Sequence, residues 1–205
     1  MPERFFIITD MRKIILGLLC TLSLLLCSCK INIQQEVKQS NDGYRQKLII
    51  TMSEDLINMI NADDDGDWVA EIKKSMRDDY GKDAEISEAY NGEDRIITAS
   101  FVANKKNAKY APKKMGKDIT VPLLDYNEDE YNADAVEGLN TVSSTYTVII
   151  DKSIAPSVQS IKLRRKSGDT VSLKATSNKT AYAISFPTAW AYAQDPVVEI
   201  ILTTP

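Results

Sequence analysis

The residue types that most often perform catalysis are scarce in this chain. It contains no histidine and only three cysteines, Cys20, Cys27 and Cys29. Without histidine, the commonest general base and the commonest metal ligand are absent, and Ser-His-acid or Cys-His arrangements cannot form. Carboxylate pairs and Ser-Lys pairs remain available, but no motif singles out one pair. We therefore expect a domain that binds rather than catalyses, with no cofactor and no metal.

Cys29 is the one residue for which the sequence predicts a specific chemistry. Arg12 and Lys13 precede an apolar run, Ile14 to Leu26, which leads into Cys27, Ser28 and Cys29. A basic start and a short apolar core are typical of an export signal. The run is shorter than the roughly 20 apolar residues that a membrane span needs. Its last four residues resemble the lipobox of bacterial lipoproteins, in which the cysteine sulfur receives diacylglycerol and cleavage makes that cysteine the new N-terminus.

This resemblance implies a signal peptide over residues 1–28 and lipidation of Cys29. Several acyl chains would then hold a single ectodomain, residues 29–205, at the cell membrane or outer membrane, outside the cytoplasm. An uncleaved anchor or an ordinary secretion signal is the alternative, and either places the rest of the chain outside the cytoplasm as well. Glu3 and Asp10 put acid where a signal peptide requires base, so we expect the true start at Met11.

The composition of the mature chain argues against nucleic acid as a partner. Removing residues 1–28 takes away three basic and two acidic residues, so the net charge changes from −4 to −5. A mildly acidic domain does not attract polyanions over its whole surface. Cys29 would be the one cysteine left, so no disulfide is expected within the mature chain.

The pattern of apolar residues predicts an α+β fold. Strands are expected over 30–37 and 44–52, joined by a turn at Asn41-Asp42-Gly43, and helices from Ser53 and over 68–80. Two more strands are expected over 84–90 and 95–102, and the chain is strand-rich from about residue 141, with expected strands over 145–150, 158–165, 171–176, 181–186 and 197–202. We therefore predict antiparallel strands, with two helices near the N-terminus packed on a strand-rich sheet.

Two charged segments could bind ions or membranes. Asn61-x-Asp63-x-Asp65-Gly66 resembles the opening of an EF-hand loop, but the twelfth position is Ile72 and Glu71 comes one place early, which rotates it by about 100° on a helix. We interpret this segment as an acidic linker that caps a helix. The lysine-rich stretch Lys105 to Lys117 could meet anionic headgroups, but we interpret it as a solvated loop balanced by the acidic stretch after it.

Three large aromatic residues are the candidates for ligand binding. Trp68 begins the expected helix over 68–80, Phe186 ends a late strand, and Trp190 follows it. Such rings could line an apolar pocket between the helical part and the strand-rich part, filled by an acyl chain. A fully packed core without a gap is the alternative, and it is the more frequent use of such residues.

The order of features also resembles the LppM-type family of lipoprotein ectodomains. The resemblance rests on Cys29 leading at once into the hairpin Lys30–Met52, on the strand–turn–strand Leu163–Thr170 with its Gly-Asp turn, and on the closing strand Val197–Pro205. It implies an α+β envelope domain with an apolar cavity for lipid-like ligands, and it supplies no catalytic residues.

These observations predict a non-catalytic envelope lipoprotein. Its partners would be the membrane, through the N-terminal acyl chains, and either a lipid or glycolipid ligand or a protein partner. A structural or adhesin-like surface lipoprotein is the alternative, and an enzyme comes third.

Overall fold

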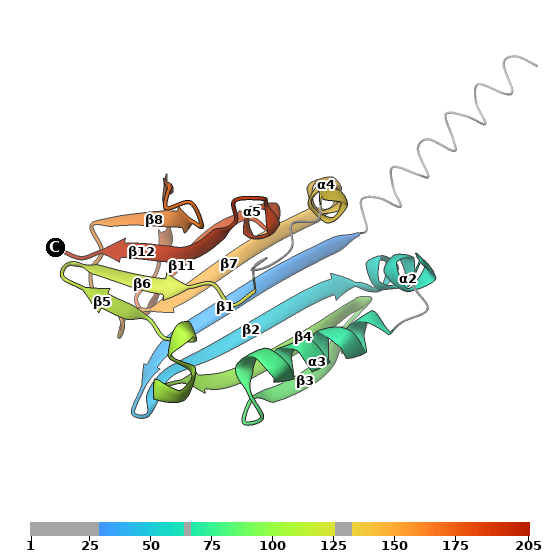
Figure 1. The fold of residues 1–205 in the computed structure, drawn as a ribbon, viewed down its shortest axis with the longest axis horizontal. Coiled ribbons are helices and arrows are strands. Elements are labelled where there is room, and N and C mark those ends of the chain that lie inside the picture. The colour runs from blue at the N-terminus through green and yellow to red at the C-terminus, as the bar shows by residue number, and fades with distance from the viewer. Residues whose placement is uncertain (1–28, 64–66, 126–132) are drawn as a thin grey trace, which may run out of the picture.

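The computed structural model describes residues 29–63, 67–125 and 133–205 (Figure 1). Within these ranges the chain folds into two β-sheets and four α-helices. None of these helices is long and apolar enough to cross a membrane.

Seven strands form the larger sheet, called sheet A. Its strand order is β10 (Thr176–Ser177), β11 (Ala181–Pro187), β7 (Ser143–Asp151), β1 (Lys30–Ser40), β2 (Gly43–Ser53), β4 (Asp94–Ala103) and β3 (Glu85–Asn91). All neighbours are antiparallel except β1 and β7, which run parallel with Ile33 opposite Tyr146. Sheet A is therefore mixed, and the prediction of antiparallel strands alone is wrong for the centre of this sheet.

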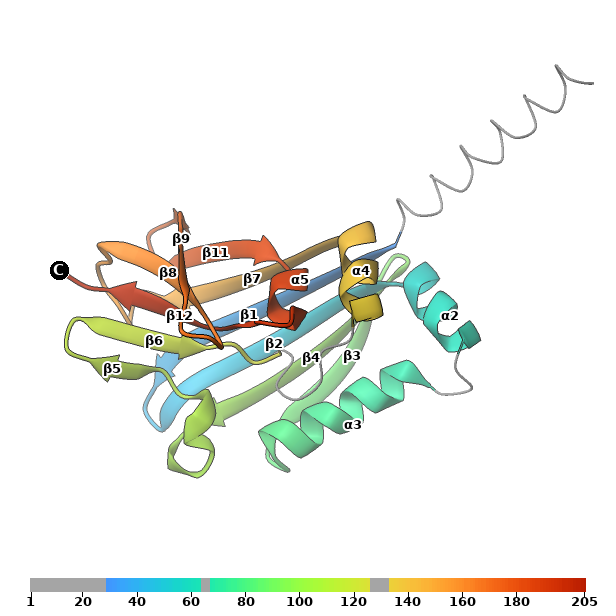
Figure 2. The same cartoon turned by 45° about the horizontal axis from the view of Figure 1, so that its top comes forward.

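Five strands form the smaller sheet, called sheet B, and all of its neighbours are antiparallel. Its order is β5 (Lys113–Met115), β6 (Asp118–Pro122), β12 (Val197–Thr203), β8 (Ser160–Arg165) and β9 (Thr170–Leu173). Strands from the middle and the end of the chain thus share one sheet. Figure 2 shows sheet B on one side of sheet A, at the end away from the start of β1.

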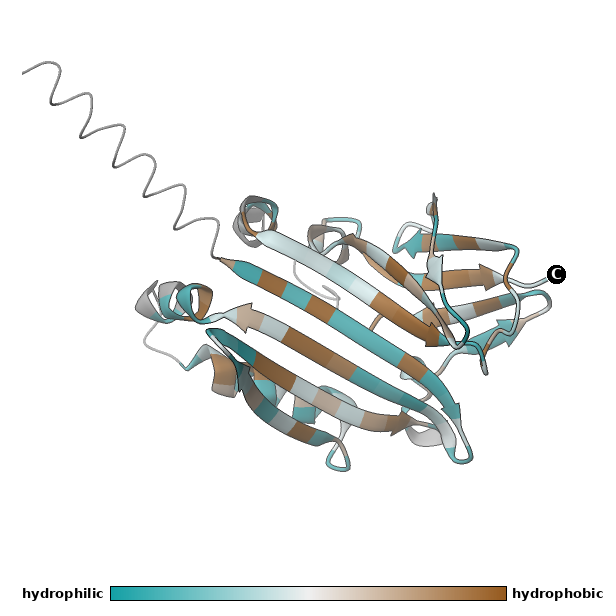
Figure 3. Cartoon of the chain, turned by 180° about the vertical axis from the view of Figure 1, so that it is seen from behind, coloured by the Kyte–Doolittle hydropathy of each residue, from teal (hydrophilic) through white to brown (hydrophobic). Residues whose placement is uncertain are grey.

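The helices complete the layer that covers sheet A. They are α2 (Glu54–Asp63), α3 (Trp68–Tyr80), α4 (Ala133–Thr141) and α5 (Ala189–Tyr192), and a 3₁₀ segment, η1 (Lys105–Tyr110), follows β4. Two helices follow the first hairpin, but the predicted arrangement of two helices near the N-terminus is wrong, because α4 and α5 lie in the second half of the chain. Seen from behind, the strands of sheet A lie in front of the helices (Figure 3).

The hairpin of β1 and β2 forms where the sequence predicts it. Asn41 and Asp42 make the turn, and Ser40 pairs with Gly43. Gly43 has φ +137°, and a Cβ at this position would come within 2.4 Å of the Ala103 carbonyl oxygen. Only glycine fits here, because the turn requires a positive φ and β4 passes directly beside it.

The core lies between sheet A and the layer of sheet B and helices. Alternate residues of the sheet A strands are buried on the inner face, as the period of two in a strand requires. The largest of these residues include Ile33, Leu48, Met52, Ile97, Tyr146 and Ile184. Sheet B contributes Leu163, Ile200 and Leu202 from the other side. Each fully buried aliphatic side chain stabilises the fold by about 1.5–3 kcal/mol.

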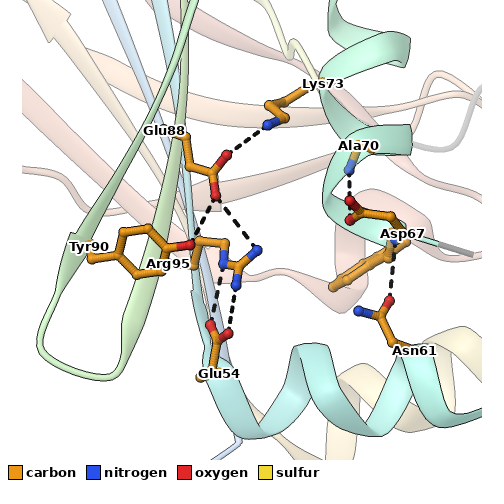
Figure 4. A network of polar contacts seen from close by, with 9 residues as sticks. Glu54, Asn61, Asp67, Ala70, Lys73, Glu88, Tyr90 and Arg95 are labelled. Carbon is orange, nitrogen blue, oxygen red and sulfur yellow. Dashed lines mark hydrogen bonds and ion pairs between the residues drawn. The ribbon is translucent and has the colours of Figure 1, made fainter.

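A polar network attaches α2 and α3 to the edge of sheet A (Figure 4). Arg95 of β4 donates to both carboxylate oxygens of Glu54, the shorter contact being 2.6 Å, and Lys73 of α3 lies 2.7 Å from Glu88 of β3. These groups are partly exposed, so each pair contributes at most about 1 kcal/mol.

Local capping determines where α3 begins. The Asp67 carboxylate accepts from the Ala70 N–H at 3.1 Å, and the Asn61 side chain accepts from the Trp68 N–H at 3.2 Å (Figure 4). The sequence predicted this cap. Residues 64–66, the centre of the broken EF-hand pattern, lie outside the described residues.

Candidate functional site

A groove opens beside the end of β4, where β3 no longer pairs with it. Its volume is about 1130 Å³, and it lies between the C-terminal end of α3, η1 and the start of β2. The pairing of β3 with β4 stops at Glu85 and Ser100, so β4 continues to Ala103 without β3 beside it. The groove therefore exists because one strand of sheet A is shorter than its neighbour.

Three aromatic rings form the floor of the groove. Tyr80 ends α3, Phe101 is on the inner face of β4, and Tyr110 ends η1. Tyr80 and Phe101 are stacked at 4.7 Å, and Tyr110 contacts both rings edge-on at 5.3 and 5.6 Å. Such aromatic pairs contribute about 0.5–1.5 kcal/mol each beyond the burial of their area. The floor is therefore well packed.

The rim of the groove carries charges of both signs. Asp78, Asp79, Asp83 and Glu85 come from the end of α3 and the start of β3, and Asp42 comes from the β1–β2 turn. The C-terminal end of a helix carries partial negative charge, which adds to these acids. The basic residues of the rim are Arg45, Lys47 and Lys109. The groove thus suits a ligand with charged groups of both signs.

A buried polar network supports the floor from behind. Gln35 of β1 and Gln46 of β2 are 0 % exposed. Gln35 donates to the Pro122 carbonyl at 2.9 Å and to the Gln46 side-chain oxygen at 3.3 Å. Gln46 donates to the Tyr110 carbonyl at 2.7 Å. Buried amides need such partners, so the two glutamines hold the ends of β6 and η1 in place.

The chain directly after β6 is held by hydrogen bonds from β1, β7 and α3. The Leu124 N–H donates to the Gln35 side-chain oxygen at 3.2 Å and to the Tyr146 hydroxyl at 3.3 Å. The Tyr146 hydroxyl donates to the same Gln35 oxygen at 3.1 Å, and the Tyr80 hydroxyl donates to the Leu124 carbonyl at 2.9 Å. Sheet A and α3 therefore meet at Leu124.

Asp125 follows Leu124, and its carboxyl group lies among tyrosine side chains. Burial raises its pKa, against the effect of a hydrogen bond with Tyr192, while the charge of Asp79 raises it further. Burial also raises the pKa values of Tyr80, Tyr146 and Tyr192. These phenols therefore stay protonated at neutral pH, and they act as hydrogen-bond donors rather than as nucleophiles.

The structure separates the residues that the sequence analysis proposed for ligand binding. Phe186 stacks between Tyr146, at 5.2 Å, and Trp190, at 6.3 Å. Arg165 lies 5.9 Å from the centre of the Trp190 ring. Trp68 belongs instead to the corner between α2 and α3, and all three rings pack against the core cluster. Cys29 is buried and directly precedes β1.

The groove and the network behind it were not predicted from the sequence. Asp78, Asp79 and Asp83 are exposed, and no motif in the sequence singles them out. One signal was available, because Gln35 falls between Ile33 and Val37 on the buried face of a predicted strand. Among the described residues, no group of three or more acidic or cysteine side chains is arranged to hold a metal ion.

Comparisons with protein-family models, with curated proteins and with solved structures found no match for this chain.

Proposed function

We propose that the protein is a lipid-anchored, non-catalytic binding domain outside the cytoplasm, and that it binds a protein partner through the groove over Tyr80, Phe101 and Tyr110. The observation that carries this proposal is a groove lined by charges of both signs beside the packed rings of Tyr80, Phe101 and Tyr110. Polar and charged groups of this kind form the rim of protein interfaces.

The lining of the groove favours a protein segment over an acyl chain. Eight of its 17 lining residues are charged. An acyl chain needs a concave site with mainly apolar walls that exclude water. An extended segment of a partner could instead place basic groups near the acids of α3 and acidic groups near Arg45 and Lys47.

The position of the groove also fits a partner away from the anchoring membrane. The Lys30 N–H donates to the Ser53 hydroxyl at 3.1 Å, so β1 is held in sheet A from its first residue after Cys29. A strand rises about 3.3 Å per residue, so the 11 residues of β1 span about 35 Å. The groove reaches Asp42, at the far end of this strand. The proposal includes lipid anchoring at Cys29 and a relation to the LppM-type family of lipoprotein ectodomains.

Site-specific photo-crosslinking in cells tests the proposal. A photoreactive phenylalanine analogue would replace Lys47 or Glu85, which flank Ser100 on the outer face of sheet A beside the groove, in the full chain. We expect the same protein-sized crosslinked product from both positions. The charge reversal Arg45→Glu should remove the product obtained from position 85.

Ser185 supplies the control position, because it is exposed in β11, well separated from the groove in sheet A. Crosslinking from Ser185 to the same product would contradict a groove-specific partner. A mass increase of lipid size from the rim positions would assign the groove to a lipid instead.

A further inference from the structure

The turn between β5 and β6 presents an exposed basic tip. Lys113, Lys114 and Lys117 are exposed, and Met115 between them is 75 % exposed. We propose that this tip, residues 113–117, binds the anionic phospholipid headgroups of a membrane that faces the one holding Cys29. That the contacted membrane faces the anchoring membrane rests on the anchoring at Cys29 in the proposed function. The binding of headgroups by the tip does not depend on it.

The tip is held rigidly, so its side chains are presented together. Gly116 has φ +61° and closes a tight turn in which Met115 pairs with Asp118. The Lys117 carbonyl accepts from the Thr204 N–H at 2.8 Å, and the Thr203 hydroxyl donates to Asp118 at 2.8 Å. The tip is thereby joined to the end of β12. The Asp118 carboxylate is engaged with Thr203.

The lysines of the tip form no ion pair among the described residues. The ion pairs found between described residues involve Lys30, Lys73, Arg95 and Arg164, and none of the three lysines of the tip. From the sequence, the acidic stretch that begins at Asp125 was expected to balance them. Asp125 lies among phenols at the other end of β6, and residues 126–132 of that stretch lie outside the described residues.

The chemistry of the tip fits phospholipid headgroups. Lysine is a mobile point charge that suits phosphate groups without a fixed geometry. Each basic residue near an anionic leaflet strengthens binding by about fivefold, so three lysines together supply about a hundredfold. The negative net charge of the whole chain acts weakly here, because charges more than about 8–10 Å away are screened at physiological salt. Met115 can enter the apolar boundary between the headgroups.

The location of the tip points to a second membrane. Figures 1 and 2 both place the turn between β5 and β6 at the end of the molecule opposite to the start of β1. A domain anchored at Cys29 and standing along β1 would carry the tip away from its own membrane. The protein would then bridge two membranes across its long dimension.

Vesicle clustering with the full chain tests this inference. The chain would be reconstituted into phosphatidylcholine donor vesicles and mixed with acceptor vesicles of phosphatidylcholine that contain 30 % phosphatidylglycerol or none. We expect clustering, measured by dynamic light scattering, only with the anionic acceptors, and its loss in 0.5 M salt. Flotation of the protein with the donor vesicles reports anchoring separately, so a failure of the anchor is distinguishable.

Charge reversal locates the contact. The triple variant Lys113→Glu, Lys114→Glu, Lys117→Glu should require at least about 100-fold more protein for clustering. The matched control reverses three exposed lysines elsewhere, Lys74, Lys174 and Lys179, and should cluster vesicles like the wild type.

A second variant, Met115→Ser, should weaken clustering by only a few-fold, since one side chain is removed and the charge is kept. Thermal melts test whether each variant is folded. If the triple variant does not fold, the single variant Lys117→Glu takes its place. The inference would be overturned if the charge-reversal variant clustered vesicles like the wild type, or if the control lost clustering as strongly as the charge-reversal variant. Clustering of the neutral acceptors by the wild type would overturn it as well. Binding to soluble polyphosphate without clustering would overturn it in favour of an anionic polymer.

Discussion

Tyr80 and Phe101 stack face to face under the groove, with ring centroids 4.7 Å apart and ring planes 9° apart. The first ring belongs to α3 and the second to sheet A. The Tyr80 hydroxyl also reaches the Leu124 carbonyl at 2.9 Å. One side chain therefore joins the groove floor, a helix and the chain that leaves β6.

Replacing Tyr80 by Phe tests the hydrogen bond in this arrangement. The stacking with Phe101 is kept, but the Leu124 carbonyl loses its donor in a buried place. We expect the free energy of unfolding to fall by about 1–3 kcal/mol. Urea denaturation measures it, with the exposed Tyr90→Phe as the control. An unchanged midpoint would mean that the Leu124 carbonyl is satisfied without Tyr80.

Replacing Gln35 by Met should destabilise the fold more strongly. The side chains are similar in volume, but the Leu124 N–H, the Pro122 carbonyl and the Gln46 side chain each lose a buried partner. We expect a loss of about 2–4 kcal/mol in the free energy of unfolding. Adding Gln46→Met should cost less than the sum of the two single changes, because the two residues share one hydrogen bond. Additive effects would show that the two glutamines act independently.

Asp125 should make the stability depend on pH. Burial raises its pKa in the folded protein above the ordinary value of 3.8. Below pH 3.8 both states bind the proton. As the pH rises towards the folded pKa, only the unfolded state releases it, and the folded state loses relative stability by about 1.4 kcal/mol per unit of pKa shift.

Asp125→Asn should therefore be more stable than the wild type at pH 7, and this advantage should shrink as the pH falls to 3.5. Chemical denaturation across this range measures the difference. Asp195→Asn is the control with the opposite sign, because hydrogen bonds from Ser167 lower the pKa of Asp195. A stability difference for Asp125→Asn that stays constant with pH would contradict the raised pKa.

The Thr188 hydroxyl is a second place where stability can be gained. Thr188 is 0 % exposed, and its hydroxyl oxygen has no hydrogen-bond partner among the described residues. Thr188→Val keeps the shape and removes the unpaired group, so we expect a gain of about 1 kcal/mol, measured as a higher melting temperature. Thr188→Ser is the comparison, since it keeps the hydroxyl and should give no gain.

Cys29→Ser should release the protein from membranes or leave it unprocessed. The reason is that the hydroxyl of serine does not replace the thiol that would carry diacylglycerol. Labelling of cells with a clickable fatty acid, followed by membrane fractionation, measures the outcome. Equal labelling of the variant and the wild type would disprove lipidation at Cys29.

Local features of the chain were predictable because they depend on a few neighbouring residues. The helix over 68–80 begins after its predicted cap at Asp67 and is followed by Gly81, and the hairpin turns at Asn41 and Asp42. Capping and turn chemistry act within four residues, so they can be recognised without knowledge of the fold. The alternation of apolar residues likewise predicts most strands, including β11 and β12.

The candidate site was decided by contacts between distant parts of the chain. Gln46 and Tyr110 are 64 residues apart, and Gln35 and Tyr146 are 111 residues apart, yet each pair is joined by a hydrogen bond. The parallel pairing of β1 with β7 has no local signal, because a strand's own sequence does not specify its neighbour. The sequence alone therefore determined the local elements and the predicted chemistry of Cys29. Only the tertiary structure decided which polar side chains became buried and which aromatic rings became the floor of a groove.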